Sequence, residues 1–352
     1  MNPILVEALR GPHVESWHRG AIAIVDADGA VLSAIGDIER AVFPRSAVKA
    51  LQALPLVASG AADRLGLTAA ELALACASHG GEPGHVATAL SMLGKAGFDE
   101  ACLECGAHWP YEDAAARDLA VLGRTPNALH NNCSGKHAGF LCLACALAPR
   151  GADLRRFAQG YVDAGHAVMR EVTAALGAAT GTDLGNAPRG IDGCSIPAFA
   201  IPLRALALGF ARLGTGNGLA ADYALAARRL RAGVAEAPFM VAGSGRMDTL
   251  VMQRLGQRVF MKVGAEGMYC AALPSRGLGV AIKIDDGNNA RAAEVAIAAV
   301  IEACLPLAGD ETALLRGYSE GVLRNRRGIE VGALRASDVL RTSLAQRWSP
   351  AN

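Results

Sequence analysis

Residues 21–33 of the chain are AIAIVDADGAVLS. Two apolar runs, 21–25 and 30–33, flank four residues that contain two aspartates and a glycine. Strand-forming residues on both sides of an Asp- and Gly-containing turn are typical of a β-hairpin. We therefore predict a hairpin within residues 16–37, close to the N-terminus.

A strand-forming pattern returns only in the last third of the chain. Residues 258–263, RVFMKV, and 278–284, LGVAIKI, are short and rich in β-branched residues. Terminal strands that pair with one another would close a single sheet around a long helical insertion. We predict an α/β fold with a mainly antiparallel sheet from residues 1–40 and 241–352, flanked by helices. Residues 41–240 form the helical part, and the two parts together make one catalytic unit.

The insertion and the last part of the chain carry apolar residues three and four positions apart, which predicts helices. Pro55 predicts a break inside the first of these helices, residues 45–60. Two helices within residues 68–94 are separated by a glycine-rich segment. The other predicted helices are 136–148, 152–178, 219–235 and 288–304.

Composition excludes several classes of protein. The chain has 352 residues, 52% of them hydrophobic and 19% charged, so it can bury a sizeable core. Its net charge of +1 provides no field that would attract nucleic acid or a membrane surface. The longest apolar stretches, 138–148 and 295–301, are shorter than the roughly 20 residues that cross a bilayer. Nine cysteines without a secretion signal favour reduced thiols, and we expect a cytoplasmic protein.

A Ser-x-x-Lys motif, Ser46 to Lys49, lies at the start of the first predicted helix. Residues three apart lie on one helical face, so the hydroxyl and the amine can meet. A serine becomes a good nucleophile only when a base takes its proton. A lysine is such a base when burial or a neighbouring cation such as Arg45 lowers its pKa by roughly 3 from about 10.4. The alternative is an exposed helix surface on which the two side chains have no joint role.

Two polar loops are further candidates for the walls of a site. Residues 76–85 place Ser78, His79 and Glu82 after an apolar helix. The alternative for this loop is a turn between helices, capped by the serine and the glutamate. Residues 130–137, HNNCSGKH, precede an apolar helix whose N-terminus would attract a carboxylate. We interpret the second loop as functional, because so many polar side chains are costly to hold in a plain connection.

Two shorter segments carry single reactive groups. Residues 190–195 contain Asp192 and Cys194 between glycines, which suits positioning of a ligand or, alternatively, a buried structural thiol. Lys262 precedes Val-Gly at a predicted strand end, where glycine lets the backbone approach a ligand. The alternative is an edge-strand lysine. The Cys-x-x-Cys pairs at 102/105 and 142/145 are too far apart for a zinc ribbon, and the second lies in an apolar helix.

Seven motifs in order, spread over nearly the whole chain, make the sequence similar to a known family. It resembles the asparaginase II family, typified by rhizobial inducible L-asparaginases. The matching segments are VESWHRG 14–20, PRSAVK 44–49, CASHGGE 76–82, CGAHWP 105–110, NNCSGKH 131–137, DGC 192–194 and KVGAEG 262–267.

The resemblance implies a fold like that of serine β-lactamases and glutaminases. It implies hydrolysis of L-asparagine to L-aspartate and ammonia by a homodimer. The family's two Ser–Lys tandems match Ser46 with Lys49, and Ser78 with Lys262. We favour Ser46 as the nucleophile, because its lysine lies one helical turn away, and Ser78 as a proton relay.

The family's metal site, zinc in its best-described members, is formed by two cysteines and a lysine. These positions match Cys133, Lys136 and Cys194. Lysine is a rare zinc ligand, because it must lose a proton to bind. Arg45 would lower the pKa of Lys49 or hold the substrate α-carboxylate. The remaining candidates for substrate binding or the site walls are His79, Glu82, Asp192 and His137.

Three alternatives remain at this stage. The protein could be a glutaminase, or another serine amidase or β-lactam-type hydrolase with a Ser-x-x-Lys motif. Against the β-lactam type, the chain lacks a convincingly placed Ser-x-Asn motif. A more remote alternative is a non-catalytic zinc- or thiol-binding protein built on Cys133 and Cys194. That function would leave the serine–lysine pairs unexplained.

Overall fold

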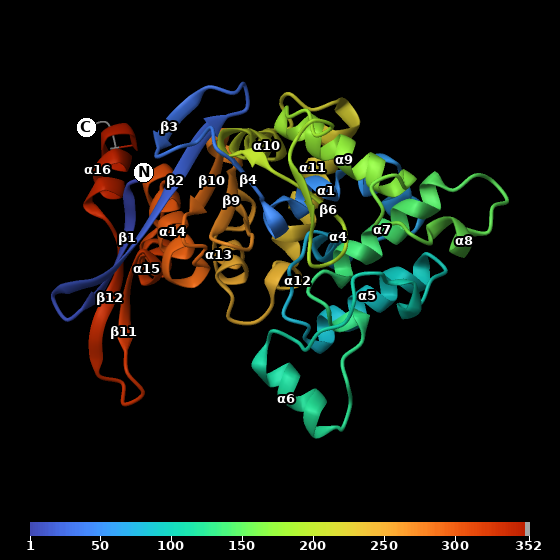
Figure 1. The fold of residues 1–352 in the computed structure, drawn as a ribbon, viewed down its shortest axis with the longest axis horizontal. Coiled ribbons are helices and arrows are strands. Elements are labelled where there is room, and N and C mark those ends of the chain that lie inside the picture. The colour runs from blue at the N-terminus through green and yellow to red at the C-terminus, as the bar shows by residue number, and fades with distance from the viewer. Residues whose placement is uncertain (349–352) are drawn as a thin grey trace. The chain divides into compact units, whose positions relative to one another are not determined.

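The computed structural model describes residues 1–348. The chain divides into two compact units (Figure 1). The first, here the sheet unit, comprises Met1–Ala47, Ala200–Thr215 and the chain from Met261 onward. The second, here the helical unit, comprises Val48–Phe199 and Gly216–Phe260. Relative to the boundaries predicted at 41 and 241, the sheet unit also contains residues 200–215, and the helical unit extends to residue 260.

The sheet unit is built on one eight-stranded sheet. Its strand order is β11-β12-β1-β2-β10-β9-β8, with β3 paired to β2. The strands are β1 Ile4–Arg10, β2 His13–Asp26, β3 Val31–Ile35, β8 Phe260–Val263, β9 Met268–Leu273, β10 Leu278–Ile284, β11 Glu320–Arg324 and β12 Glu330–Ala336. A short pair, β4 Ala41–Val42 with β7 Ile201–Pro202, lies apart from it.

Strands from the two ends of the chain pair directly. β2 and β10 are antiparallel, with register from Leu278 opposite Asp26 to Ile284 opposite Gly20. The pairs β1–β2, β1–β12, β11–β12, β9–β10 and β2–β3 are also antiparallel. Blue N-terminal strands and red and orange C-terminal strands therefore lie side by side in Figure 1. The predicted mixed α/β fold, its antiparallel sheet from both chain ends and the hairpin within 16–37 are confirmed.

Helices cover the sheet. β9 is buried along its whole length, and it contacts both α10 (Leu203–Thr215) and α14 (Glu294–Cys304). A strand buried at every position has both faces covered. Gly279 allows α10 to lie close to β10, because a Cβ there would be 1.9 Å from the Ala207 carbonyl oxygen. α15 (Gly309–Ser319) and α16 (Asp338–Trp348) pack on α14, which follows a π-helix at Asn289–Ala293.

The helical unit surrounds one buried helix. α7 (Ser134–Leu147) is buried at every position from Ser134 to Ala144, as expected of a helix that is apolar on all sides. Gly135 lets it approach α4, since a Cβ there would lie 2.5 Å from the Leu74 carbonyl oxygen. The other helices are α1 Lys49–Gln52, α2 Leu54–Ala58, α3 Ala61–Arg64, α4 Ala69–Ala75, α5 Pro83–Lys95, α6 Asp113–Val121, α8 Leu154–Ala158, α9 Ala167–Thr180, α11 Ala221–Glu236, α12 Phe239–Ala242 and α13 Met247–Leu255.

Two predicted helices are divided in the structure. The segment 45–60 becomes a 3-10 helix, Arg45–Val48, followed by α1 and α2, with Pro55 in the first turn of α2, where its missing N–H costs nothing. The segment 152–178 becomes α8 and α9. A short hairpin, β5 Arg189–Ile191 with β6 Pro197–Phe199, completes the helical unit. Among residues 1–348, none of the helices has both the length and the apolar character that spanning a membrane requires.

Candidate active site

Lys49, the first residue of α1, is the centre of a buried polar cluster in the helical unit. Its side chain is 1% exposed. Its Nζ lies 2.6 Å from the Ala77 carbonyl oxygen, 2.8 Å from Ser78 Oγ and 3.1 Å from Cys133 Sγ. Burial lowers the pKa of Lys49, and the charge of Lys136 lowers it further, against the opposing effect of Cys133. The amine is therefore biased toward its neutral form.

Hydrogen-bond chemistry fixes what a neutral Lys49 would do. The Ala77 carbonyl can only accept, so the amine donates there. The Ser78 hydroxyl can donate, so the amine's lone pair is available to its proton at 2.8 Å. A nucleophile or relay within this distance of a base is the geometry that serine activation needs. Backbone bonds hold Ser78 in place, with its N–H donating to the Val241 carbonyl at 2.9 Å.

The other two catalytic candidates belong to the sheet unit. Ser46 is partly buried in the 3-10 helix Arg45–Val48, where Arg45 has φ of 51°. A left-handed conformation at a non-glycine residue costs energy and is often found at functional sites. Lys262 on β8 is completely buried, and its Nζ donates to the Val263 carbonyl at 2.8 Å. Gly264, next along, allows a close approach of the Pro44 carbonyl, 2.7 Å from where a Cβ would be.

Cys133, Lys136 and Cys194 come together from two parts of the helical unit. Cys133 and Lys136 lie at the start of α7, and Cys194 lies in the loop between β5 and β6. Lys136 Nζ is 3.0 Å from Cys194 Sγ. The hydrogen bond between the thiols holds the pKa of Cys133 well below its usual value and raises that of Cys194. Burial lowers the pKa of Lys136, but the charge of Cys133 and the contact with Cys194 outweigh it and raise the pKa.

This donor set fits zinc. Two sulfur atoms and an amine nitrogen converge in a buried place, and thiolate and nitrogen are the ligands zinc prefers. Binding would require Cys194 and Lys136 to lose their protons. Within the described chain, no group of three or more His, Cys, Asp and Glu side chains is arranged to hold a metal ion. The set at the start of α7 has a different composition, with lysine as its third member.

The loop that presents Cys194 is tightly folded. Asp192 Oδ1 accepts from Gly193 N at 2.7 Å, and the Asp192 carbonyl accepts from Ser195 N at 2.9 Å. Ser195 has φ of 77°, another left-handed non-glycine residue. The Asp192 carboxylate also contributes to the raised pKa of Lys136. The structure thus places Asp192 beside the thiol cluster.

His79 has both ring nitrogens engaged inside the protein. It is fully buried, its Nδ1 accepts from Gly81 N at 3.2 Å, and its Nε2 lies 3.0 Å from Ser134 Oγ. Ser134 Oγ in turn donates to the Leu129 carbonyl, so the ring proton lies on Nε2. Burial, then the neighbouring His85, lowers the pKa of His79 well below its usual value. The imidazole is neutral, and it fixes the Ser78 loop to α7.

Glu82 joins the Ser78 loop to the segment after α12. Its Oε1 accepts from Ser244 N at 2.9 Å and its Oε2 accepts from Ser244 Oγ at 2.6 Å. Gly243 has φ of 108°, and a Cβ there would lie 2.3 Å from Glu82 Oε1. The pair holds the end of α12, whose Val241 carbonyl accepts from Ser78 N. A cavity of about 250 Å³ beside it is lined by Gly80, Glu82, Tyr111, Glu112, Asp113, Ala242, Ser244 and Arg246.

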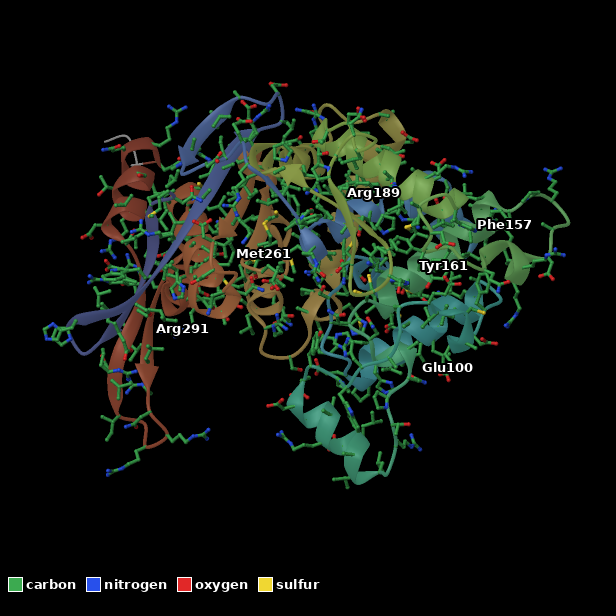
Figure 2. All side chains as sticks on the ribbon, viewed as in Figure 1. Glu100, Phe157, Tyr161, Arg189, Met261 and Arg291 are labelled. Atoms are coloured by element: carbon green, nitrogen blue, oxygen red, sulfur yellow. The ribbon has the colours of Figure 1, made fainter. Side chains whose placement is uncertain are left out.

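His137 lies one residue beyond Lys136 on α7. Its Nδ1 is 2.7 Å from the hydroxyl of Tyr161, a residue labelled in Figure 2. The same hydroxyl accepts from Glu104 N at 2.9 Å. Burial lowers the pKa of His137 well below its usual value, and its buried Nε2 has no hydrogen-bond partner within residues 1–348.

The structure brings Ser78 to Lys49. The coupling of Ser78 with Lys262 that the family resemblance implies stays a prediction. Tyr161 and Ser244 were not recognised as neighbours of the site. The Gly-Ser-Gly sequence at 243–245 was the available signal for Ser244, and nothing local marked Tyr161.

A buried amine that is hydrogen-bonded to a serine hydroxyl is typical of hydrolases that use a serine with a lysine base. The comparison with protein families adds an independent finding. A family model described as L-asparaginase II matches residues 6–336, nearly the whole chain. The chain therefore belongs to the L-asparaginase II family, which confirms the resemblance found in its motifs.

A search of curated proteins gave no significant match. A solved structure titled "Crystal Structure Analysis of Mglu" superposes with a TM-score of 0.32 at 17% sequence identity. The alignment covers 78% of this chain and 64% of that chain. At this TM-score the two folds are not equated.

Proposed function

We propose that the protein hydrolyses L-asparagine to L-aspartate and ammonia through an ester of aspartate on a serine. Membership of the L-asparaginase II family suggests the reaction. The observation that supports the chemistry is the 2.8 Å contact between Lys49 Nζ and Ser78 Oγ, in a place where burial lowers the pKa of the amine.

A serine Oγ attacks the side-chain amide carbon, and its proton passes to Lys49, through or from Ser78 Oγ. The resulting ammonium gives a proton to the amide nitrogen, the C–N bond breaks and ammonia leaves. Water then attacks the ester, with Lys49 taking a proton from it; the Lys49 ammonium returns this proton to the serine Oγ as the C–O bond breaks, and L-aspartate is released. General base catalysis of this kind supplies about 10²–10⁴-fold in rate.

The nucleophile assignment made from sequence, Ser46 with Ser78 as relay, stays a prediction. In that assignment the bond between Lys49 and Ser78 is the last link of the relay. Mass spectrometry of protein quenched during turnover locates the ester. An aspartyl adduct on the peptide with Ser46 supports the relay, and an adduct on Ser78 makes Ser78 the nucleophile. The family resemblance is the reason for including Lys262 among the catalytic residues. Ammonia release by Lys262→Met tests this role.

Arg45, His79, Glu82, Asp192 and His137 stay in the proposal as residues of the site and its walls. His79 and Glu82 act by holding the Ser78 loop, since their polar atoms bind Ser134, Gly81 and Ser244. Arg45 stands beside Ser46 as a cation for the substrate α-carboxylate.

We include zinc in the proposal, held by Cys133, Lys136 and Cys194. When bound, the ion supplies a fixed positive charge beside the thiolates. Cys133 Sγ lies 3.1 Å from Lys49 Nζ, so neutralising this thiolate removes the interaction that favours the Lys49 ammonium. Cys133 would then oppose the neutral form of Lys49 less.

The finer expectations from the family resemblance also belong to the proposal. They are a fold like that of serine β-lactamases and glutaminases, a homodimer, a cytoplasmic location and preference for L-asparagine. Size-exclusion chromatography with light scattering tests the dimer.

The decisive experiment measures ammonia release by the purified protein from L-asparagine, L-glutamine and a chromogenic cephalosporin, with and without a chelator. Release from L-asparagine above all supports the proposal. Faster turnover of L-glutamine or the cephalosporin would move the protein to the alternative serine hydrolases. Zinc binding with no ammonia from any amide would leave a non-catalytic metal-binding protein.

A further inference from the structure

The sheet unit contains a cavity that the proposed reaction does not use. Its volume is about 920 Å³, within the range of pockets that hold small molecules. It lies where α14 ends, between α15 and α16, with Arg276 contributed by the 3-10 turn Pro274–Arg276. None of its lining residues belongs to the proposed catalytic or zinc-binding sets.

The cavity wall carries a surplus of positive charge. Four arginines line it, Arg276, Arg316, Arg341 and Arg347, against two glutamates, Glu302 and Glu320. Two of the arginines have carboxylate partners. Arg316 Nε is 3.4 Å from Glu302 Oε1, and the Arg341 guanidinium lies 2.6 Å from Asp338.

The other two arginines, Arg276 and Arg347, carry the unbalanced positive charge of the cavity wall. Neither has a carboxylate partner within the described part of the chain. The buried Cys304 thiol does not offset their charge, because burial raises its pKa to about 12 and keeps it protonated. Arginines without an acidic partner at a pocket wall favour a ligand with an oxyanion, which a guanidinium binds through paired N–H groups.

The Trp348 indole N–H is a further hydrogen-bond donor that favours a ligand with an acceptor oxygen. The Trp348 indole Nε1 is buried, and it has no hydrogen-bond partner among residues 1–348. Arg276 Cζ lies 5.9 Å from the centre of the Trp348 ring, in a cation–π contact. A buried N–H without an acceptor is costly, and an oxygen brought by a ligand would satisfy it.

The rest of the wall is apolar. Leu305, Pro306, Leu307 and Leu344 line the cavity beside the polar groups. A bare inorganic anion would leave this surface in contact with water, whereas a ligand with an apolar body would cover it. L-asparagine, which is small and polar throughout, does not match this lining.

We propose that this cavity is a binding site for a small organic anion, a carboxylate carried on an apolar body. The carboxylate is held by Arg276, Arg347 and the Trp348 N–H, and the apolar body packs on the leucines. The competing explanation is that the arginines only compensate the dipoles of α14 and α16, near whose C-termini they lie. That explanation predicts effects on stability and no affinity for a ligand.

Isothermal titration calorimetry on the full chain distinguishes a carboxylate-binding site from arginines that only compensate helix dipoles. The probes are phenylacetate and octanoate, with flat and flexible apolar bodies, and the controls are 2-phenylethanol and inorganic phosphate. We expect at least one carboxylate to bind and both controls to bind at least about tenfold more weakly. Absence of binding by both carboxylates up to 10 mM overturns the proposal. Binding of 2-phenylethanol or phosphate as tight as that of the carboxylates does so as well.

Variants locate the binding. The double variant Arg276→Gln/Arg347→Gln should weaken carboxylate binding by about tenfold or more. Trp348→Phe, which removes the N–H and keeps an aromatic, though smaller, side chain, should weaken it by a smaller factor. The matched controls are Arg326→Gln on the exposed β11–β12 turn and Trp17→Phe. Unchanged binding in the double variant, with an unchanged melting curve, overturns the assignment. The titration is independent of ammonia release, so its result and that of the proposed function can be told apart.

Discussion

Lys49 and Lys136 are both buried in the helical unit, yet their pKa values shift in opposite directions. Burial lowers the pKa of each. At Lys136 the Cys133 thiolate and the Cys194 sulfur outweigh burial and keep the charge. At Lys49 burial prevails: the Cys133 sulfur 3.1 Å away opposes it, but the charge of Lys136 adds to it, and the other two contacts, with the Ala77 carbonyl and the Ser78 hydroxyl, carry no charge. Burial by itself therefore does not make a base; the charge of the partners decides.

Replacing Lys49 gives the largest expected effect. Lys49→Met keeps the volume and removes the base, and we expect kcat/KM for L-asparagine to fall about 10²–10⁴-fold. Lys49→Arg should be as inactive, because a guanidinium does not lose its proton near neutral pH. Steady-state assays of ammonia release provide the measurement.

The control for this pair is Lys95→Met, which removes another lysine of the helical unit outside the cluster. It should lose stability through Glu71 and keep kcat/KM within about threefold. Substantial activity in Lys49→Arg would show that a cation suffices there, and the contrast between the two buried lysines would lose its meaning for catalysis.

The zinc content of variants tests whether Cys133, which contacts both Lys49 and Cys194, is a metal ligand. Cys133→Ser should lower bound zinc more than roughly tenfold, because even partners of metal ligands are worth that much in affinity. Cys102→Ser, at a partly exposed free cysteine of the same unit, should leave zinc unchanged. Elemental analysis of the purified variants measures both. Equal zinc content in Cys133→Ser and Cys102→Ser would show that Cys133 is not a zinc ligand.

Loss of a hydrogen bond between Glu82 and Ser244 should have a smaller effect on catalysis. Glu82→Gln can accept only one of the two Ser244 hydrogen bonds, so the Val241 carbonyl that fixes Ser78 is held less firmly. We expect kcat to fall about tenfold with little change in KM, as for a misplacement of a catalytic group. Glu112→Gln, at the N-cap of α6 beside the same cavity, is the matched control. A loss in both variants alike would reduce the role of Glu82 to general stability.

The partly buried ion pair between Glu71 and Lys95, outside the site, gives the smallest effect and extends the comparison to a carboxylate. Burial raises the pKa of Glu71, but hydrogen bonds from Lys95, Thr68 and Ser91 outweigh it, so the pKa lies below its usual value. Its stabilisation is therefore complete above about pH 4.3, the unfolded value, and is lost as pH falls through the lower folded value.

Glu71→Gln should lower the free energy of unfolding by about 1–3 kcal/mol at pH 7, and by less in acid. Urea denaturation at pH 7 and at pH 3 measures this difference. Glu330→Gln, which removes the exposed contact with Arg324, should change it by less than about 1 kcal/mol at either pH. A Glu71→Gln deficit that grows in acid would contradict the shifted pKa.

Local pattern made much of the fold predictable. The hairpin, the paired helices α4 and α5 and the long helix α7 follow from spacing and turn residues within a few positions. β9 was missed, because MYCAAL is buried on both faces and shows no alternation. β1, β11 and β12 in the same sheet were not predicted either. The single helix predicted over 152–178 divides at a stretch that contains Gly160 and Gly165.

By itself the sequence determined the family, the residue types at every reactive position, the main helices and the strands β2, β3, β8 and β10, since these depend on neighbours a few residues apart. Only the tertiary structure decided that Lys49 meets Ser78, 29 positions away, and that Cys194 meets Cys133 and Lys136. It also decided which buried lysine keeps its charge. Protonation depends on loss of water and on the charges nearby, and both are set by residues that folding brings together from distant parts of the chain.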